Sequence, residues 1–245
     1  MNNKKKYVKT DLAIELLKEK KDYNYTNIID NIKVTKIYLD FEKSKLYNKS
    51  IGNYITIIFD DAYKYENEIV DVLKNELFKL IKNKEKVLII GLGNRNSTPD
   101  SLGTEVVEKI IVSDKVCAIS PGVYTGIETF DYVEALSKKI KPTVIILVDS
   151  LVSGSFDRIN KTIQMSDTGI SPGSGVRSNK KEISYSNIKV PVISIGVPTV
   201  ADIKNIINED NIFDLMVTPK EIDFDIKILS NIISNAINKS LYDTL

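Results

Sequence analysis

Histidine is absent from all 245 residues of the sequence. It is the side chain whose ordinary pKa allows proton exchange near neutral pH, so its absence excludes whole classes of enzyme. Triads that depend on an imidazole, zinc sites with histidine ligands and histidine general bases are all excluded. If the protein is a hydrolase, carboxylates, lysine or bound water must move the protons.

Cysteine and long apolar runs are scarce as well. The one cysteine, Cys117, excludes an internal disulfide framework, and its apolar neighbours predict a buried thiol rather than a nucleophile. No apolar run approaches the roughly 18 residues of a membrane-spanning helix. The basic N-terminus is not followed by the apolar stretch of a signal peptide. We therefore expect a soluble, cytoplasmic protein with no membrane partner.

Excess charge of either sign is also lacking. The 34 Lys and Arg residues nearly balance 33 Asp and Glu residues, which gives a formal net charge of +1. Such a chain has no strong global field that would attract nucleic acid or an anionic membrane. We expect no direct nucleic-acid partner, and local surfaces must select whatever the protein binds.

The sequence does contain an alternation of strand and helix patterns. Short β-branched runs between turn residues predict buried strands at 87–90, 116–119, 143–148 and 192–195. Apolar periodicity predicts helices at 66–82, 102–111, 128–140 and 219–238. This order predicts an α/β fold, with a mostly parallel sheet flanked by helices and functional loops at the carboxyl ends of its strands. Alternating residues at 33–59 predict an extra small β segment, as a hairpin or sheet edge.

Two aspartates follow predicted strands. Asp100 lies beyond the Gly-Leu-Gly-Asn turn at 91–94, just before a predicted helix, and is either a helix cap or a functional acid. Asp149 follows the apolar strand 144–148, where lost hydration favours the protonated form of a carboxyl. A loop-capping role is the alternative for Asp149. Together the two could supply the acid and the base of a hydrolase.

Long loops rich in Gly, Ser, Thr and Pro occupy 120–129 and 164–175. Loops of this kind on a rigid sheet often carry binding residues. Glu128 in the first loop is either a functional acid or a helix first-turn acid. Asp167 in the second is either functional or a turn former.

Several segments together resemble the germination protease family, the spore endopeptidases of Bacillus and Clostridium relatives. The matching segments lie at residues 8–15, 91–94, 98–103, 125–129, 163–170, 172–176, 196–200 and 215–221. They span the chain from one end to the other, although residues 20–86 match only weakly.

The resemblance implies an atypical aspartic endopeptidase, similar in fold to the hydrogenase maturation endopeptidases and working without a cofactor or metal. Members are made as zymogens, trim their own N-terminus, assemble as homotetramers and degrade small acid-soluble spore proteins during germination. This implies a location in the cytoplasm of the forespore and the spore core. The two proposed catalytic aspartates of the family correspond to Asp100 and Asp149.

The resemblance also implies a processing site between Asp11 and Leu12. Residues 1–11 would then be a propeptide and residues 12–245 a single α/β peptidase domain. The acid-apolar-Ala order at 11–13 resembles the sequence cut in the storage proteins, so the N-terminus would act as an internal substrate. Substrate-binding or supporting roles would fall to Asn94, Gly126, Glu128, Asp167 and Ser174.

The chain departs from the family pattern in three places. Residues 152–155 stand where relatives carry an Ala-Ala-Arg-Ser-like stretch, the loop before Thr125 is shorter, and a long insertion is reduced to residues 201–214. Two alternatives stay open. One is a metal-assisted peptidase with Asp100, Asp149 and Glu128 as oxygen ligands. The other is an inactive paralogue that binds peptide or nucleotide.

Overall fold

The computed structural model of the protein describes residues 10–17, 25–29, 31–122, 126–171, 181–204 and 215–242. The predicted alternation of strands and helices is confirmed. The strands are β1 (Tyr25–Ile29), β2 (Ile32–Leu39), β3 (Gly52–Ile58), β4 (Val87–Gly91), β5 (Val116–Ile119), β6 (Val144–Ser153), β7 (Thr162–Ser166), β8 (Val192–Asp202) and β9 (Met216–Val217). The α-helices are α1 (Ala13–Leu16), α2 (Phe41–Tyr47), α3 (Glu66–Leu80), α4 (Leu102–Val107), α5 (Thr129–Ile140), α6 (Tyr185–Ile188) and α8 (Ile222–Leu241). Two short 3₁₀ helices are η2 (Thr98–Asp100) and η3 (Phe156–Arg158).

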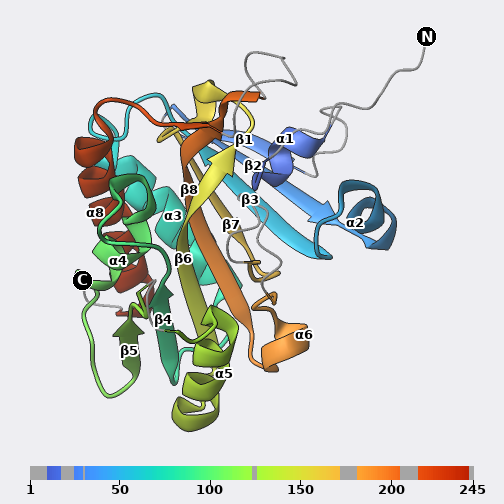
Figure 1. The fold of residues 1–245 in the computed structure, drawn as a ribbon, viewed down its shortest axis with the longest axis vertical. Coiled ribbons are helices and arrows are strands. Elements are labelled where there is room, and N and C mark those ends of the chain that lie inside the picture. The colour runs from blue at the N-terminus through green and yellow to red at the C-terminus, as the bar shows by residue number, and fades with distance from the viewer. Residues whose placement is uncertain are drawn as a thin grey trace.

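The described strands form one nine-stranded sheet in the order β1-β2-β3-β7-β8-β6-β4-β5, with β9 paired to β8 (Figure 1). Pairing is parallel from β5 through β4 and β6 to β8. It is antiparallel from β8 through β7, β3 and β2 to β1. The predicted α/β sheet is therefore confirmed, with parallel pairing in one half. The predicted extra β segment belongs to this same sheet, because β3 pairs with β7.

Two strands differ from the sequence-based prediction. β6 does not end at Asp149, because residues 150–153 continue the pairing with β8, with a register shift between Leu151 and Val152. The predicted loop at 164–175 begins with a strand instead, since β7 pairs with β3 on one side and β8 on the other. Both segments are polar and weakly patterned, so neighbouring strands rather than local hydrophobicity make them β.

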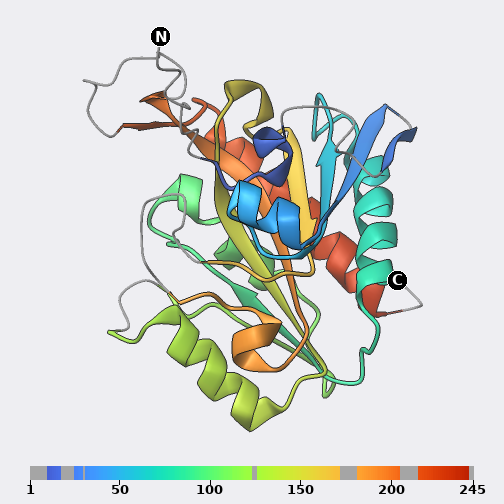
Figure 2. The same cartoon turned by 90° about the vertical axis from the view of Figure 1, so that its right-hand side faces the viewer.

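Helices cover both faces of the sheet. Apolar residues of α3, α4 and α8 form one core cluster with the strands, and α5 and α6 pack on the opposite face. The short helix α1 shares the face of α5 and α6, since Ile170 contacts the clusters of both. In Figure 2 the terminal helix α8, in red, lies behind the sheet, with α5 and α6 in front. β4, β6 and β8 are thus buried from both sides, which gives the loops at their ends a rigid base.

The remaining expectations from composition concern Cys117 and membrane spans. Cys117 on β5 is half-buried and packs against the second core cluster. Among the helices that the structure describes, none combines the length and the apolar character needed to cross a bilayer.

Glu76 ties α3 to the sheet. Its carboxylate lies 2.5 Å from Lys36 Nζ on β2 and 2.7 Å from Lys79 Nζ, and 8% of its side chain is exposed. Burial by itself would raise the pKa of Glu76, but hydrogen bonds and charge from the two lysines outweigh burial and lower that pKa. The ion pair therefore stabilises the fold only while Glu76 is ionised.

We expect Glu76→Gln to reduce the free energy of unfolding at neutral pH by about 1–3 kcal/mol, since two cations lose their buried partner. A carboxyl with a lowered folded pKa contributes stability above its unfolded pKa and loses it as pH falls through the folded pKa. The difference from the native protein should therefore shrink in acid. Urea unfolding at neutral and acidic pH measures it, with exposed Asp71→Asn on α3 as the control. A difference that stays constant with pH would contradict this assignment.

Candidate active site

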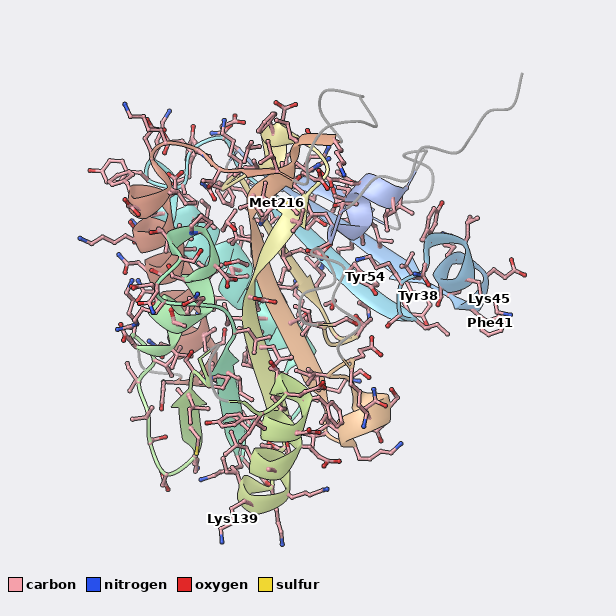
Figure 3. All side chains as sticks on the ribbon, viewed as in Figure 1. Tyr38, Phe41, Lys45, Tyr54, Lys139 and Met216 are labelled. Carbon is pink, nitrogen blue, oxygen red and sulfur yellow. The ribbon has the colours of Figure 1, made fainter. Side chains whose placement is uncertain are left out.

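A pocket of about 920 Å³ lies over β6, β7 and β8, and both Asp100 and Asp149 line it. Its walls come from the β4–α4 connection, the loop before α5, the link between α2 and β3, and β9. Tyr54 on β3 and Met216 on β9 are among the lining residues, and Figure 3 labels both. Residues from distant parts of the sequence thus share one cavity, as carboxyl groups that act on one substrate must.

Asp100 is held by a tight turn between β4 and α4. It ends the 3₁₀ helix η2, and its carbonyl oxygen accepts a 2.8 Å hydrogen bond from the N–H of Asn94. Gly93 has a φ of +109°, and a Cβ there would lie 2.0 Å from the Asp100 carbonyl oxygen, so this turn requires glycine. The N-cap of α4 is Ser101. Asp100 is therefore not the helix cap, which was the alternative left open by the sequence.

Asp149 lies within β6 and is 9% exposed. Its Oδ1 accepts a 2.9 Å hydrogen bond from the N–H of Ser150. The preceding carbonyl, of Val148, accepts a 2.8 Å bond from Leu92 at the end of β4. This bond holds the turn at Gly93 next to the strand that carries Asp149. The Asp100 side chain lies beside Gly93 in that turn. The turn that carries Asp100 is therefore hydrogen-bonded to the strand that carries Asp149, and both aspartates line the same pocket.

Of the other residues predicted for the site, some line the pocket and some do not. Gly126 and Glu128 line the pocket at its exposed rim, where Glu128 is the N-cap residue of α5 and makes no side-chain capping bond. Asn94 does not line it, but its Oδ1 accepts a 3.0 Å bond from Asn96 within the turn that carries Asp100.

Asp167 lies outside the pocket lining, on the surface. Its two carboxylate oxygens accept bonds of 2.8 and 2.6 Å from the backbone and side chain of Asn53. This contact fastens the end of β7 to β3. Ser174, the last of the predicted residues, is outside the residues that the structure describes.

The predicted processing site lies at the pocket. Asp11 is among the lining residues, and its N–H donates a 2.9 Å bond to the carbonyl oxygen of Val152. The N–H of Val152 in turn donates a 2.8 Å bond to Oδ2 of Asp11. Leu12 is fully buried in an apolar cluster with Ile37 and Leu151. The acid before the 11–12 bond thus makes hydrogen bonds to β6, and the apolar residue after it is buried in an apolar cluster.

Glu15 anchors the segment that follows. Its carboxylate accepts bonds of 2.8 Å from Ser153 Oγ and 2.7 Å from the N–H of Gly154, and lies 3.2 Å from Arg158 Nε. The stretch 152–155 therefore binds the N-terminal segment.

Lys49, Tyr54 and Gln164 are among the lining residues that sequence reasoning did not single out. Burial lowers the pKa of Lys49, and the charge of Asp11 partly opposes that shift. Burial also raises the pKa of Tyr54 to about 12, so this phenol stays protonated. Gln164 belongs to the quoted segment 163–170 but carries no charge to single it out, and Lys49 lies where the resemblance is weak. Neither Gln164 nor Lys49 therefore stood out in the sequence as a site residue.

Among the described residues, no group of three or more Cys, Asp and Glu side chains is arranged to hold a metal ion. Glu128 stands at the exposed rim, whereas Asp149 is buried.

Comparison with known proteins identifies a family that matches most of the chain. The sequence model of the germination protease family matches residues 3–213. The chain is 35% identical to the germination protease of Clostridium tetani, over 97% of this chain and 96% of that protein. It is 36% identical to that of Clostridium perfringens, over 96% of this chain and 95% of that protein. For Oceanobacillus iheyensis the identity is 40%, over 80% of this chain and 64% of that protein.

Among solved structures, the NiFe hydrogenase maturation protease HycI of Thermococcus kodakarensis aligns with a TM-score of 0.45 and 17% identity, over 66% of this chain and 98% of that one. The family assignment rests on the sequence comparisons, which run through both aspartates and nearly the whole chain. The chain belongs to the germination protease family, and it is a peptidase of spore germination.

Proposed function

We propose that this peptidase cuts its own chain between Asp11 and Leu12 and then degrades small acid-soluble spore proteins, using Asp100, Asp149 and one water molecule. The observation that carries the proposal is the shared pocket, which Asp100, Asp149 and Asp11 all line. Residues 1–11 then form the propeptide and residues 12–245 the single peptidase domain. We further propose a homotetramer that acts in the forespore and the spore core.

In the proposed mechanism, one of the two aspartates is ionised and removes a proton from water, which attacks the carbonyl carbon of Asp11. The other is protonated and donates its proton to the departing amine of Leu12. Asp149 is buried, and Asp100 lines the same pocket. Two carboxyls so placed favour a state in which one proton is divided between them.

Substrate choice follows from the contacts of the N-terminal segment. The N–H of Val152 and the Lys49 ammonium favour an acidic side chain before the cut. The apolar cluster around Leu12 favours an apolar residue after it. Ala13 is 2% exposed, so the next position favours a small residue. A storage protein with an acid-apolar-Ala sequence would make the same contacts once residues 11–13 of the chain itself no longer occupy them.

The test is to incubate the purified full chain and follow its mass. Because Asp11 lies in the pocket of its own chain, we expect loss of residues 1–11 at a rate that does not depend on protein concentration. The processed protein should then cut a purified small acid-soluble spore protein between an acid and an apolar residue, as sequencing of new N-termini would reveal. No cut at either site would favour the inactive paralogue. Loss of both activities after exhaustive chelation, with return on adding a divalent metal, would favour the metal-assisted alternative.

A further inference from the structure

The carbonyl oxygen of Asp11 accepts two hydrogen bonds from side chains on different elements. Lys49 Nζ donates one of 3.0 Å from the link between α2 and β3, and Gln164 Nε2 donates one of 3.2 Å from β7. This carbonyl belongs to the peptide bond that the proposed function assigns to cleavage, and any catalytic role of its two donors rests on that function. Two convergent donors on such an oxygen are the arrangement that stabilises negative charge developing there.

Gln164 holds the chain on both sides of the 11–12 bond. While its Nε2 donates to the carbonyl of Asp11, its Oε1 accepts a 2.7 Å bond from the N–H of Ala13. With both ends of its amide engaged, the side chain has one orientation, and its donor stays aimed at the carbonyl oxygen.

The strand register places this carbonyl on the side of Asp149. Gln164 of β7 is paired with Gly196 of β8, and Gly196 is paired with Asp149 of β6. Residues in one such row point to the same face, and neighbouring strands lie about 4.8 Å apart. Gln164 and Asp149 therefore flank the same stretch of pocket from two strands apart.

Lys49 brings a positive charge to the same oxygen. Lys49 is half-buried as a residue, and burial lowers the pKa of its ammonium, while the carboxylate of Asp11 acts against that shift. A partly desolvated cation interacts more strongly with a nearby negative charge than one in water does. Its attraction to the carbonyl oxygen therefore grows as that oxygen gains charge.

We infer that Lys49 and Gln164 form the oxyanion hole of this peptidase. As the water oxygen bonds to the carbonyl carbon of Asp11 and its proton passes to one aspartate, the carbonyl π electrons move onto oxygen. Lys49 and Gln164 bind that oxyanion. The C=O bond then re-forms, the bond to the nitrogen of Leu12 breaks, and that nitrogen takes the proton of the other aspartate. Loss of one such donor typically lowers the rate about 10²- to 10³-fold.

The experiment compares self-processing rates of Lys49→Met and Gln164→Glu with the native full chain by intact mass. Met fills similar space without a donor, and Glu keeps an acceptor for Ala13 while losing the donor. We expect each variant to cut about 10²- to 10³-fold more slowly. Lys49→Arg, which restores a cationic donor, should recover most of the rate. Lys45→Met, at an exposed lysine on α2, should cut at the native rate.

A second measurement separates chemistry from docking. Hydrogen exchange of the amides of residues 11–13, made in an Asp149→Asn background where the bond stays intact, should show that Lys49→Met leaves the segment protected. A near-native cutting rate for Lys49→Met would overturn the inference, and so would joint loss of protection and cutting. If the native chain does not cut between Asp11 and Leu12, the proposed function fails, and the oxyanion hole fails with it. If the native chain cuts and Lys49→Met cuts at the same rate, only the oxyanion hole is overturned.

Discussion

Replacing either Asp100 or Asp149 with asparagine should lower the rates of both self-processing and storage-protein cleavage by about 10²- to 10⁴-fold, the usual contribution of one acid–base group. Asparagine keeps the size of aspartate but can neither take nor give the proton. Both side chains line the pocket that holds Asp11, and Asp149 is buried there. Single-turnover rates of the full chain, followed by intact mass, measure the loss.

The matched control for these variants is Glu128→Gln. Glu128 lines the same pocket, but it stands at the exposed rim. In the two-aspartate mechanism its replacement should cost no more than about tenfold, because a rim contact aids binding rather than chemistry. A loss as large as that of Asp149→Asn would favour the metal-assisted alternative, in which Glu128 is a ligand. Near-native cleavage by either aspartate variant would refute the assignment of that aspartate.

The second large effect is expected at Gly103, where α4 meets the end of β4 and the middle of β6. A Cβ at this position would lie 2.3 Å from the carbonyl oxygen of Leu92 and 2.5 Å from that of Val148. Alanine in a helix normally stabilises it by about 1 kcal/mol relative to glycine. Here the methyl group meets backbone atoms that cannot rotate away, so we expect Gly103→Ala to destabilise the protein by about 3 kcal/mol or more. Cleavage should fall as well, because α4 follows the turn that carries Asp100.

Denaturant unfolding of Gly103→Ala measures this effect, and Gly122→Ala is its control. Gly122 has a φ of +73°, yet no atom of the described residues lies within 4 Å of a Cβ built there. Its replacement should cost only the backbone strain of about 1–2 kcal/mol. If Gly103→Ala were as stable as the native protein, α4 would not pack closely against β4 and β6.

The sequence is enough to predict the parallel half of the fold. Continuous β-branched runs such as 144–148 form strands wherever both faces are covered, and the glycine turn at 91–94 requires a sharp connection between strand and helix. Asp100 and Asp149 could be singled out because each follows such a strand. Their convergence could not, since it depends on the order β6-β4 in the sheet, which sequence periodicity does not contain.

The pairing that joins the predicted β segment at 33–59 to the rest of the sheet, and the residues around Asp11, lay beyond sequence reasoning for a different reason. β7 begins a segment rich in polar and turn-forming residues, and it becomes a strand only because β3 and β8 supply hydrogen-bonding partners. Lys49 is one of many lysines in the chain. Its position beside the carbonyl of Asp11 arises from tertiary contacts between the α2–β3 link and the N-terminal segment.

The most direct test of the two-aspartate mechanism is the single-turnover rate of the double variant Asp100→Asn with Asp149→Asn. Two carboxyl groups that handle one proton and one water work as a unit, and removal of either disables the pair. The double variant should therefore process the 11–12 bond no more slowly than the slower single variant does. A double variant whose loss equals the product of the two single losses would contradict the account, because each aspartate would then act independently of the other.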